Sequence, residues 1–84
     1  MRPVQERKAV NELDARGLRC PLPVLKAKKA LRALAAGDVL TVHATDPSAP
    51  ADFEAFAQAS GHLLVRNERV GDDFVIAVRK QAKS

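Results

Sequence analysis

The residues with the clearest chemical potential surround a single cysteine, in the run Arg19-Cys20-Pro21-Leu22-Pro23. Proline is tolerated in the first turn of a helix, so the run predicts Cys20 as the N-cap and Pro21 as the first helical residue. A sulfur there would meet free N–H groups and the positive end of the helix dipole. Both lower the pKa of a thiol, and the thiolate is the reactive form. We therefore predict that Cys20 is more acidic than a free cysteine.

A structural role for the cysteine is the alternative. Free cysteine is among the most buried residue types and often packs as a small hydrophobic side chain. Against this, cysteine is a mediocre N-cap, and two prolines with a neighbouring arginine fit a presented thiolate. On the local pattern alone, the reactive and the structural interpretations are about equally good.

Other catalytic chemistry has little support in the sequence. His43 and His62 are the only histidines, and neither has a motif that places it beside Cys20. A catalytic cysteine normally needs a base within reach, so a cysteine hydrolase is disfavoured. One cysteine and two scattered histidines form no metal-ligand cluster, and no glycine-rich phosphate loop is present. We expect neither a metal nor a cofactor.

Length and composition indicate one small domain. The chain has 84 residues, 46% of them hydrophobic, and a formal net charge of +4. We predict a domain over residues 10–80, with a flexible tail at 1–9 and a short tail at 81–84. No signal segment and no run of the ~18–20 apolar residues needed for a membrane span is apparent. With a single cysteine, which cannot form an internal disulfide, the cytoplasm is the expected compartment.

The charge is concentrated near the cysteine. Between Arg16 and Arg32 there are six basic residues and no acidic one. Most such runs are solvated helix faces, but a basic face can also dock an acidic protein or RNA. Sequence-tolerant RNA binding needs exposed aromatic rings, whereas Phe53, Phe56 and Phe74 fall at predicted core positions. Direct RNA binding is therefore disfavoured. The basic residues are Arg16, Arg19, Lys26, Lys28, Lys29 and Arg32.

Hydrophobic periodicity predicts the order β-α-β-α-β-β. Such a chain can form an α+β two-layer sandwich, with two helices on one face of a four-stranded mixed sheet. Thr41, His43, Arg66 and Glu68 would make the other face tolerably polar.

The first helix should bury Val24, Ala27, Leu31 and Leu34 and end at Gly37. The second should bury Ala49, Phe53, Phe56, Ala57 and Ser60, with Asp46 or Ser48 as its N-cap. The predicted strands are 10–13, 39–44, 62–68 and 73–79, the last two forming a hairpin, and the predicted helices are 21–36 and about 49–60.

The run from Leu13 to Pro23, Leu-Asp-Ala-Arg-Gly-Leu-Arg-Cys-Pro-Leu-Pro, resembles the signature of the TusA (SirA-like) sulfur-carrier family. Gly37-Asp38, Thr45-Asp46 and Gly61-His62 are further matches, so the resemblance extends to about Arg79. It implies the architecture of the C-terminal domain of translation initiation factor 3.

The resemblance also implies a function. Cys20 would accept sulfane sulfur as a persulfide from a cysteine desulfurase or rhodanese-like donor and pass it to an acceptor protein. The chain would be a sulfurtransferase component rather than a stand-alone enzyme, and we expect a monomer. Downstream routes include tRNA thiolation, sulfur oxidation and molybdenum-cofactor assembly, and a regulatory or RNA-binding module without sulfur remains the alternative. The supporting loop would comprise Asp14, Arg16, Arg19, Pro21 and Pro23, and the partner-docking residues Lys26, Lys28, Lys29 and Arg32.

Overall fold

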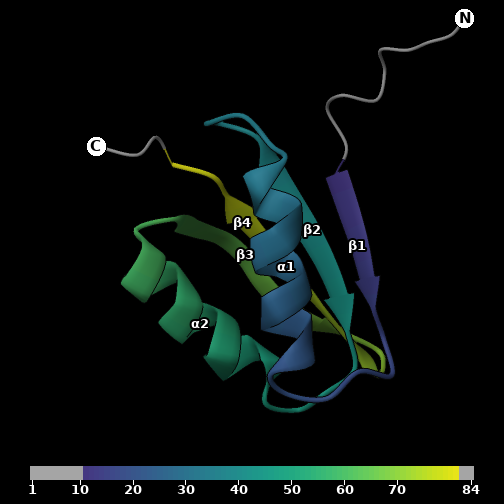
Figure 1. The fold of residues 1–84 in the computed structure, drawn as a ribbon. Coiled ribbons are helices and arrows are strands. Elements are labelled where there is room, and N and C mark those ends of the chain that lie inside the picture. Colours follow the sequence, from purple (N-terminus) through teal and green to yellow (C-terminus); the bar gives the residue numbers. More distant parts are fainter. Residues whose placement is uncertain (1–10, 82–84) are drawn as a thin grey trace, which may run out of the picture.

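The order of the elements is the predicted one. The computed structural model describes residues 11–81, so the predicted tail at 1–9, the predicted strand start at Val10 and residues 82–84 lie outside the described part. The elements follow one another along the chain as β-α-β-α-β-β (Figure 1). They are β1 (Asn11–Ala15), α1 (Leu22–Arg32), β2 (Val39–Ala44), α2 (Ala49–Ser60), β3 (Leu63–Val70) and β4 (Asp73–Arg79).

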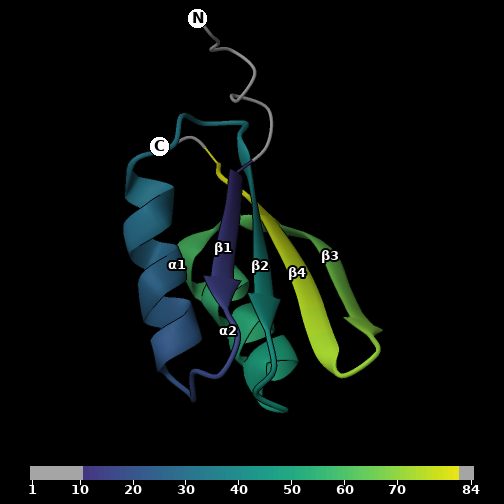
Figure 2. The ribbon, with the colours of Figure 1, turned by 90° about the vertical axis from the view of Figure 1, so that its right-hand side faces the viewer.

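The four strands form one mixed sheet in the order β1-β2-β4-β3. β1 and β2 run parallel, with Ala15 opposite Ala44 at their ends, and the other two pairings are antiparallel. Both helices cover the same face of this sheet (Figures 1 and 2). The predicted α+β two-layer sandwich is confirmed. Because β1 and β2 are parallel, the loops that follow them leave the same edge of the sheet.

The core lies between the sheet and the helices. In β2, Leu40, Val42 and Ala44 are buried and alternate with half-buried Val39, Thr41 and His43, as a strand of period two requires. From α2, the rings of Phe53 and Phe56 meet edge to face with centroids 6.2 Å apart. The stripes predicted on both helices are buried or packed against the core, except at Ser60. Ser60 is exposed, and its hydroxyl donates to the carbonyl of Phe56 (2.7 Å).

The first helix is shorter than predicted. It ends at Arg32 with Ala33 as the C-cap, whereas the periodicity predicted an end near Ala36 with Gly37 as the cap. The last turn tightens, since the Ala33 and Leu34 N–H groups donate to carbonyls three residues back. Gly37 instead occupies a turn with φ of 96°, and its N–H donates to the Lys80 carbonyl (2.7 Å). Only glycine adopts such a φ without strain.

The strand ends also differ slightly from the prediction. β1 continues to Ala15 rather than ending at Leu13, because parallel pairing with β2 extends that far. β3 begins at Leu63 and continues to Val70, with a register irregularity between Leu64 and Arg66. The open face of the sheet carries polar pairs: His43 contacts Glu12 (3.2 Å), and Arg66 forms an ion pair with Glu68.

Candidate functional site

The cysteine lies in the loop between β1 and α1, with an exposed side chain. The helix begins at Leu22 with Pro21 as its N-cap, so the prediction that Cys20 is the N-cap is wrong by one residue. The Cys20–Pro21 peptide bond is cis. A core cysteine would be buried, so the exposed thiol contradicts the structural interpretation, and the reactive interpretation stays a prediction. Cys20 is a presented thiol.

The loop of Cys20 is held by the loop that follows β2. The Cys20 N–H donates to Asp46 Oδ2 over 2.5 Å, and the Gly17 N–H donates to the Thr45 hydroxyl over 2.9 Å. The same Asp46 side chain accepts the N–H (3.2 Å) and the hydroxyl (3.1 Å) of Ser48. These bonds form because the parallel pair β1–β2 delivers both loops to one edge of the sheet. The sequence suggested Asp46 as a possible helix cap, not as a support for the cysteine.

Of the residues predicted to support the loop, Asp14 and Arg16 pair with each other. The guanidinium of Arg16 donates to Asp14 at 2.9 and 3.2 Å, and its backbone N–H adds a third bond at 3.1 Å. These hydrogen bonds from Arg16 hold the pKa of Asp14 at about 2. Arg16 also approaches Asp73 of β4 (3.8 Å). The pair thus braces the end of β1 toward the β3–β4 hairpin.

A cavity of about 490 Å³ opens beside the thiol, between the two helices. Cys20 and Pro21 line one end, Val24 and Lys28 line the α1 side, and α2 supplies the opposite wall. This space is many times the ~30 Å³ that a water molecule takes up in the liquid, so there is room for further atoms beside the thiol. The residues from α2 are Asp52, Ala55, Phe56, Ala59 and Ser60.

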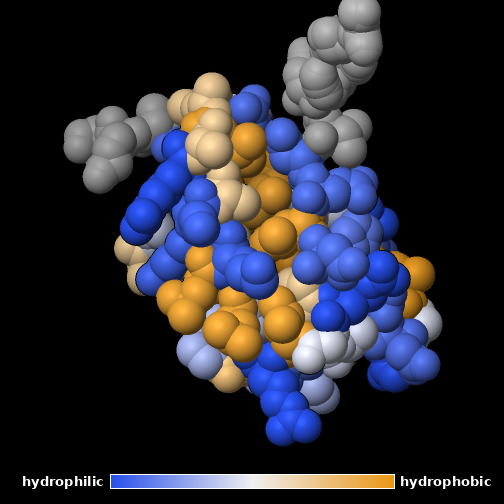
Figure 3. All heavy atoms as spheres, turned by 45° about the vertical axis from the view of Figure 1, so that its right-hand side comes forward, coloured by the Kyte–Doolittle hydropathy of each residue, from blue (hydrophilic) through white to orange (hydrophobic). Residues whose placement is uncertain are grey.

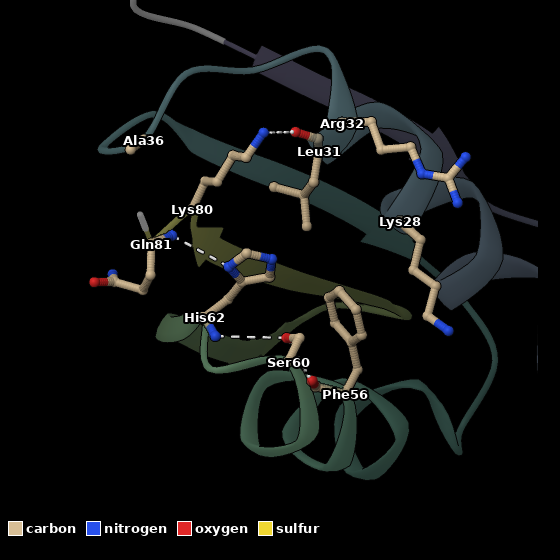
Figure 4. Close-up of a pocket in the computed structure, with 9 residues that line it drawn as sticks. All are labelled: Lys28, Leu31, Arg32, Ala36, Phe56, Ser60, His62, Lys80 and Gln81. Carbon is tan, nitrogen blue, oxygen red and sulfur yellow. Dashed lines mark hydrogen bonds between the residues drawn. The ribbon is translucent and has the colours of Figure 1, made fainter. Parts of the chain in front are cut away.

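A second cavity, of about 540 Å³, adjoins the first and shares Lys28, Phe56 and Ser60 with it (Figure 4). It lies toward the end of β4, where Lys80 Nζ donates to the carbonyls of Leu31 and Leu34. The ring of His62 lines this second cavity, and its Nδ1 accepts the N–H of Gln81 (3.1 Å). His43 lies on the open face of the sheet, so neither histidine lines the cavity of Cys20.

The electrostatics of the thiol are opposite to the prediction. The pKa of Cys20 is raised, chiefly because of hydrogen bonding with the Asp52 carboxylate, and then by desolvation and by the negative charges of Asp52 and Asp46; the Ser48 hydroxyl partly opposes this. The helix N-terminus also offers the sulfur fewer free N–H groups than predicted. Pro21 lacks an N–H group. The Leu22 N–H donates to the Arg19 carbonyl (2.8 Å) and the Cys20 N–H to Asp46. The predicted acidic thiol is therefore wrong.

The four predicted docking residues are all exposed but lie on different parts of α1. Lys28 lines both cavities and Arg32 the second, whereas Lys26 and Lys29 line neither. The sequence missed two neighbours on this helix: Leu22 and Leu25 are 46% and 49% exposed. Figure 3 shows hydrophobic side chains gathered on the α1 and β1 side of the molecule, bordered by hydrophilic ones. This combination is typical of a protein-binding surface.

The phenylalanines give no platform for stacking bases. Phe53 and Phe56 are buried, and Phe74 packs against the core, as predicted. They are the only Phe, Trp or Tyr residues of the chain. Among residues 11–81, no helix has the length and apolar character to cross a membrane, and no group of three His, Cys, Asp or Glu side chains is placed to hold a metal ion.

Comparison with known proteins places this chain in one class, the small sulfur carriers. The sequence model of the family described as sulfurtransferase TusA matches residues 11–80. The chain therefore belongs to the TusA family, and its function is that of a sulfur carrier.

Individual relatives support this family assignment. The sulfur carrier protein TusA of Allochromatium vinosum is 49% identical over 69 residues, which cover 82% of this chain and 91% of that protein. A putative sulfur carrier protein of Neisseria meningitidis serogroup A is 52% identical over 67 residues, covering 80% and 90%. The crystal structure of a SirA-like protein from Desulfitobacterium hafniense superposes with a TM-score of 0.75 at 28% identity, covering 87% of this chain and all of that one.

Proposed function

We propose that Cys20 is the sulfur-bearing residue and that it carries sulfane sulfur as a persulfide. The observation that supports this most directly is the exposed thiol at the mouth of a cavity between α1 and α2, in a chain with no second cysteine. Because the thiol is alone, it cannot resolve its own persulfide into an internal disulfide. The site is thus suited to holding a sulfur atom until another protein removes it.

The transfer has two balanced steps. In loading, the Cys20 thiolate attacks the outer sulfur of a donor persulfide, R–S–SH; a new S–S bond forms on Cys20, and the donor leaves as the thiolate R–S⁻. The proton lost by Cys20 ends on that departing thiolate, so the net products are Cys20–S–SH and R–SH. In unloading, an acceptor thiolate attacks the outer sulfur and Cys20 leaves. In each step the sulfane sulfur is transferred from one cysteine to another, and no external oxidant or reductant is consumed.

The partners follow from this chemistry. The donor is a cysteine desulfurase or a rhodanese-like protein that forms a cysteine persulfide. The acceptor is a second cysteine-bearing protein, which serves tRNA thiolation or other sulfur trafficking in the cytoplasm. Lys28 and Arg32 supply positive charge at the cavities, and exposed Leu22 and Leu25 supply apolar contact elsewhere on α1, so an acidic surface that also carries apolar side chains fits this helix.

Intact mass spectrometry tests the proposal. The protein is incubated with a cysteine desulfurase and cysteine, and we expect a gain of one sulfur atom that a reducing thiol reverses. Cys20→Ser is the control; the side chain is exposed, so the variant should fold and stay bare. If the serine variant gains sulfur equally, or if Cys20 gains none from several donors, the proposal that Cys20 carries the sulfur is wrong. Salt-sensitive RNA retention that survives loss of the thiol would then favour an RNA-binding module.

A further inference from the structure

Asp52 is the acidic residue that stands across the cavity from α1, in the first turn of α2. It lines the same cavity as Cys20 and accepts the hydroxyl of Ser48 (3.2 Å) through Oδ2. The same Ser48 hydroxyl contacts Asp46, which in turn accepts the N–H of Cys20. The Ser48 hydroxyl, which has one proton to donate, therefore lies within hydrogen-bond distance of both carboxylates, and Asp46 links it to the backbone of Cys20.

The other charged groups around the thiol do not cancel this carboxylate. Asp46, from the loop before α2, adds to its effect. Lys28 lines the cavity from α1, and Arg19 precedes the cysteine, but the influence of Arg19 falls on Asp46. Hydrogen bonding with Asp52 is the largest cause of the raised pKa of Cys20, and the groups that raise this pKa outweigh the Ser48 hydroxyl, which lowers it.

We propose that Asp52 is a positioning residue that restricts sulfur exchange on Cys20 to docked partner proteins. This inference rests on the proposed function of Cys20. With the empty carrier, the carboxylate favours the neutral thiol and lowers the fraction of attacking thiolate. With the loaded carrier, it opposes the negative charge that develops on Sγ as Cys20 leaves. A leaving thiol of higher pKa departs more slowly.

Small free thiols and docked proteins respond differently to this barrier. A free thiol R–S⁻ that strips the carrier forms R–S–SH and leaves Cys20–S⁻, which then takes a proton from water; it encounters the full effect of Asp52. A docked partner holds its cysteine against Cys20, and such proximity gives effective molarities of about 10⁵ M or more in well-oriented cases. An effective molarity of that size outweighs a modest decrease in the intrinsic rate of sulfur transfer caused by Asp52. The carrier thus keeps its sulfur in a thiol-rich cytoplasm and yields it to its acceptor.

The variant Asp52→Asn tests the inference, because asparagine keeps the shape and an oxygen for Ser48 but removes the charge. The alkylation rate of Cys20 is measured against pH. We expect the midpoint to move to lower pH, and a shift of half a unit corresponds to a roughly threefold increase in thiolate at neutral pH. The matched control is Glu54→Gln, which removes the same charge from an exposed position of α2 outside the cavity. Its midpoint should stay near that of the parent.

A second readout uses protein loaded with sulfur. Asp52→Asn should lose its persulfide to glutathione several-fold faster than the parent, with a smaller change in the rate of transfer to a protein acceptor. A purely structural role for Asp52 at the start of α2 would lower the urea midpoint and leave the alkylation profile unchanged, and that result would overturn the inference. An unchanged or higher alkylation midpoint would do the same. Alkylation requires no sulfur loading, so failure of Cys20 to carry sulfur would be recognised separately.

Discussion

Asp46 accepts the backbone N–H of Cys20 over 2.5 Å, although the two residues are 26 positions apart. The contact joins the loop after β1 to the loop after β2, and it exists because these strands run parallel and end at the same edge. The pKa of Asp46 is lowered by the N–H groups of Ser48 and Cys20, so the carboxylate is charged at neutral pH. A single side chain therefore fixes the backbone of the cysteine and contributes negative charge near its sulfur.

Replacing Asp46 by alanine should loosen the Cys20 loop while leaving the fold intact. The hydrogen bonds to Cys20 and Ser48 are lost together, so the Cys20 amide should exchange with solvent faster than in the parent. Sulfur loading should slow, because the thiol is no longer held at the cavity. Hydrogen exchange followed by mass spectrometry measures the first effect, and Asp72→Ala, in the β3–β4 turn, is a control for loss of one acidic side chain. Unchanged exchange at Cys20 would contradict the assigned role.

The ion pair between Asp14 and Arg16 should make stability depend on pH in the acid range. The folded-state pKa of Asp14 is about 2, below its ordinary 3.8. A group with a lowered pKa stabilises the fold above its unfolded-state value and loses this contribution as pH falls through the folded-state value. The contribution of Asp14 should therefore be complete above about pH 4–5 and disappear toward pH 2.

Urea unfolding of Asp14→Asn across this pH range measures the effect. The difference in unfolding free energy between parent and variant should shrink steadily as the pH falls from 5 to 2, with the parent the more stable at the upper end. Because both side chains are exposed, the effect should be small and should decrease with added salt. A difference that is independent of pH would show that the pair contributes nothing through its charge.

How far the sequence predicted this molecule depends on the range of the interactions involved. The α1 stripe with Ala27 and Leu31 and the strand at 39–44 are local patterns, and the structure has them as predicted. Recognition of the family also came from a contiguous run, Leu13 to Pro23. Local patterns at this level were sufficient for the fold and for the family.

The environment of the thiol could not be predicted in the same way. Its pKa depends on Asp46 and Asp52, which reach Cys20 only after β2 and α2 have packed. From the sequence, the nearest charges were arginines, and Pro21, the predicted first helical residue, offers no N–H group to the sulfur. The predicted end of α1 was wrong for a similar reason. Lys80, whose ammonium binds the carbonyls of Leu31 and Leu34, follows the last strand and is distant in sequence.

Reversing the charge of Lys28 should slow sulfur loading from a desulfurase. Lys28 is exposed and lines both cavities, so a docking acidic partner would approach it closely. Steering charges act mainly on association, and we expect Lys28→Glu to reduce the loading rate at low salt by roughly tenfold. Arg69→Glu, with the same change in net charge on β3, is the matched control. If both variants are slowed equally, or if Lys28→Glu loads at the parent rate at low salt, Lys28 is ordinary solvated surface.

Lys80 should stabilise the fold through the end of α1. Its Nζ donates to the carbonyls of Leu31 (2.7 Å) and Leu34 (2.6 Å). The Leu31 carbonyl also accepts the N–H of Leu34 (3.1 Å), so the Leu34 carbonyl, just beyond the end of α1, is the acceptor that depends most on Lys80. Lys80→Met keeps most of the apolar stem but removes the ammonium, and leaving such an acceptor unsatisfied costs about 1–3 kcal/mol. We expect a loss of unfolding free energy in that range from urea denaturation. Lys26→Met, at an exposed site on the same helix, should change it by less than about 0.5 kcal/mol. Equal effects of the two substitutions would show that these carbonyls are satisfied without Lys80.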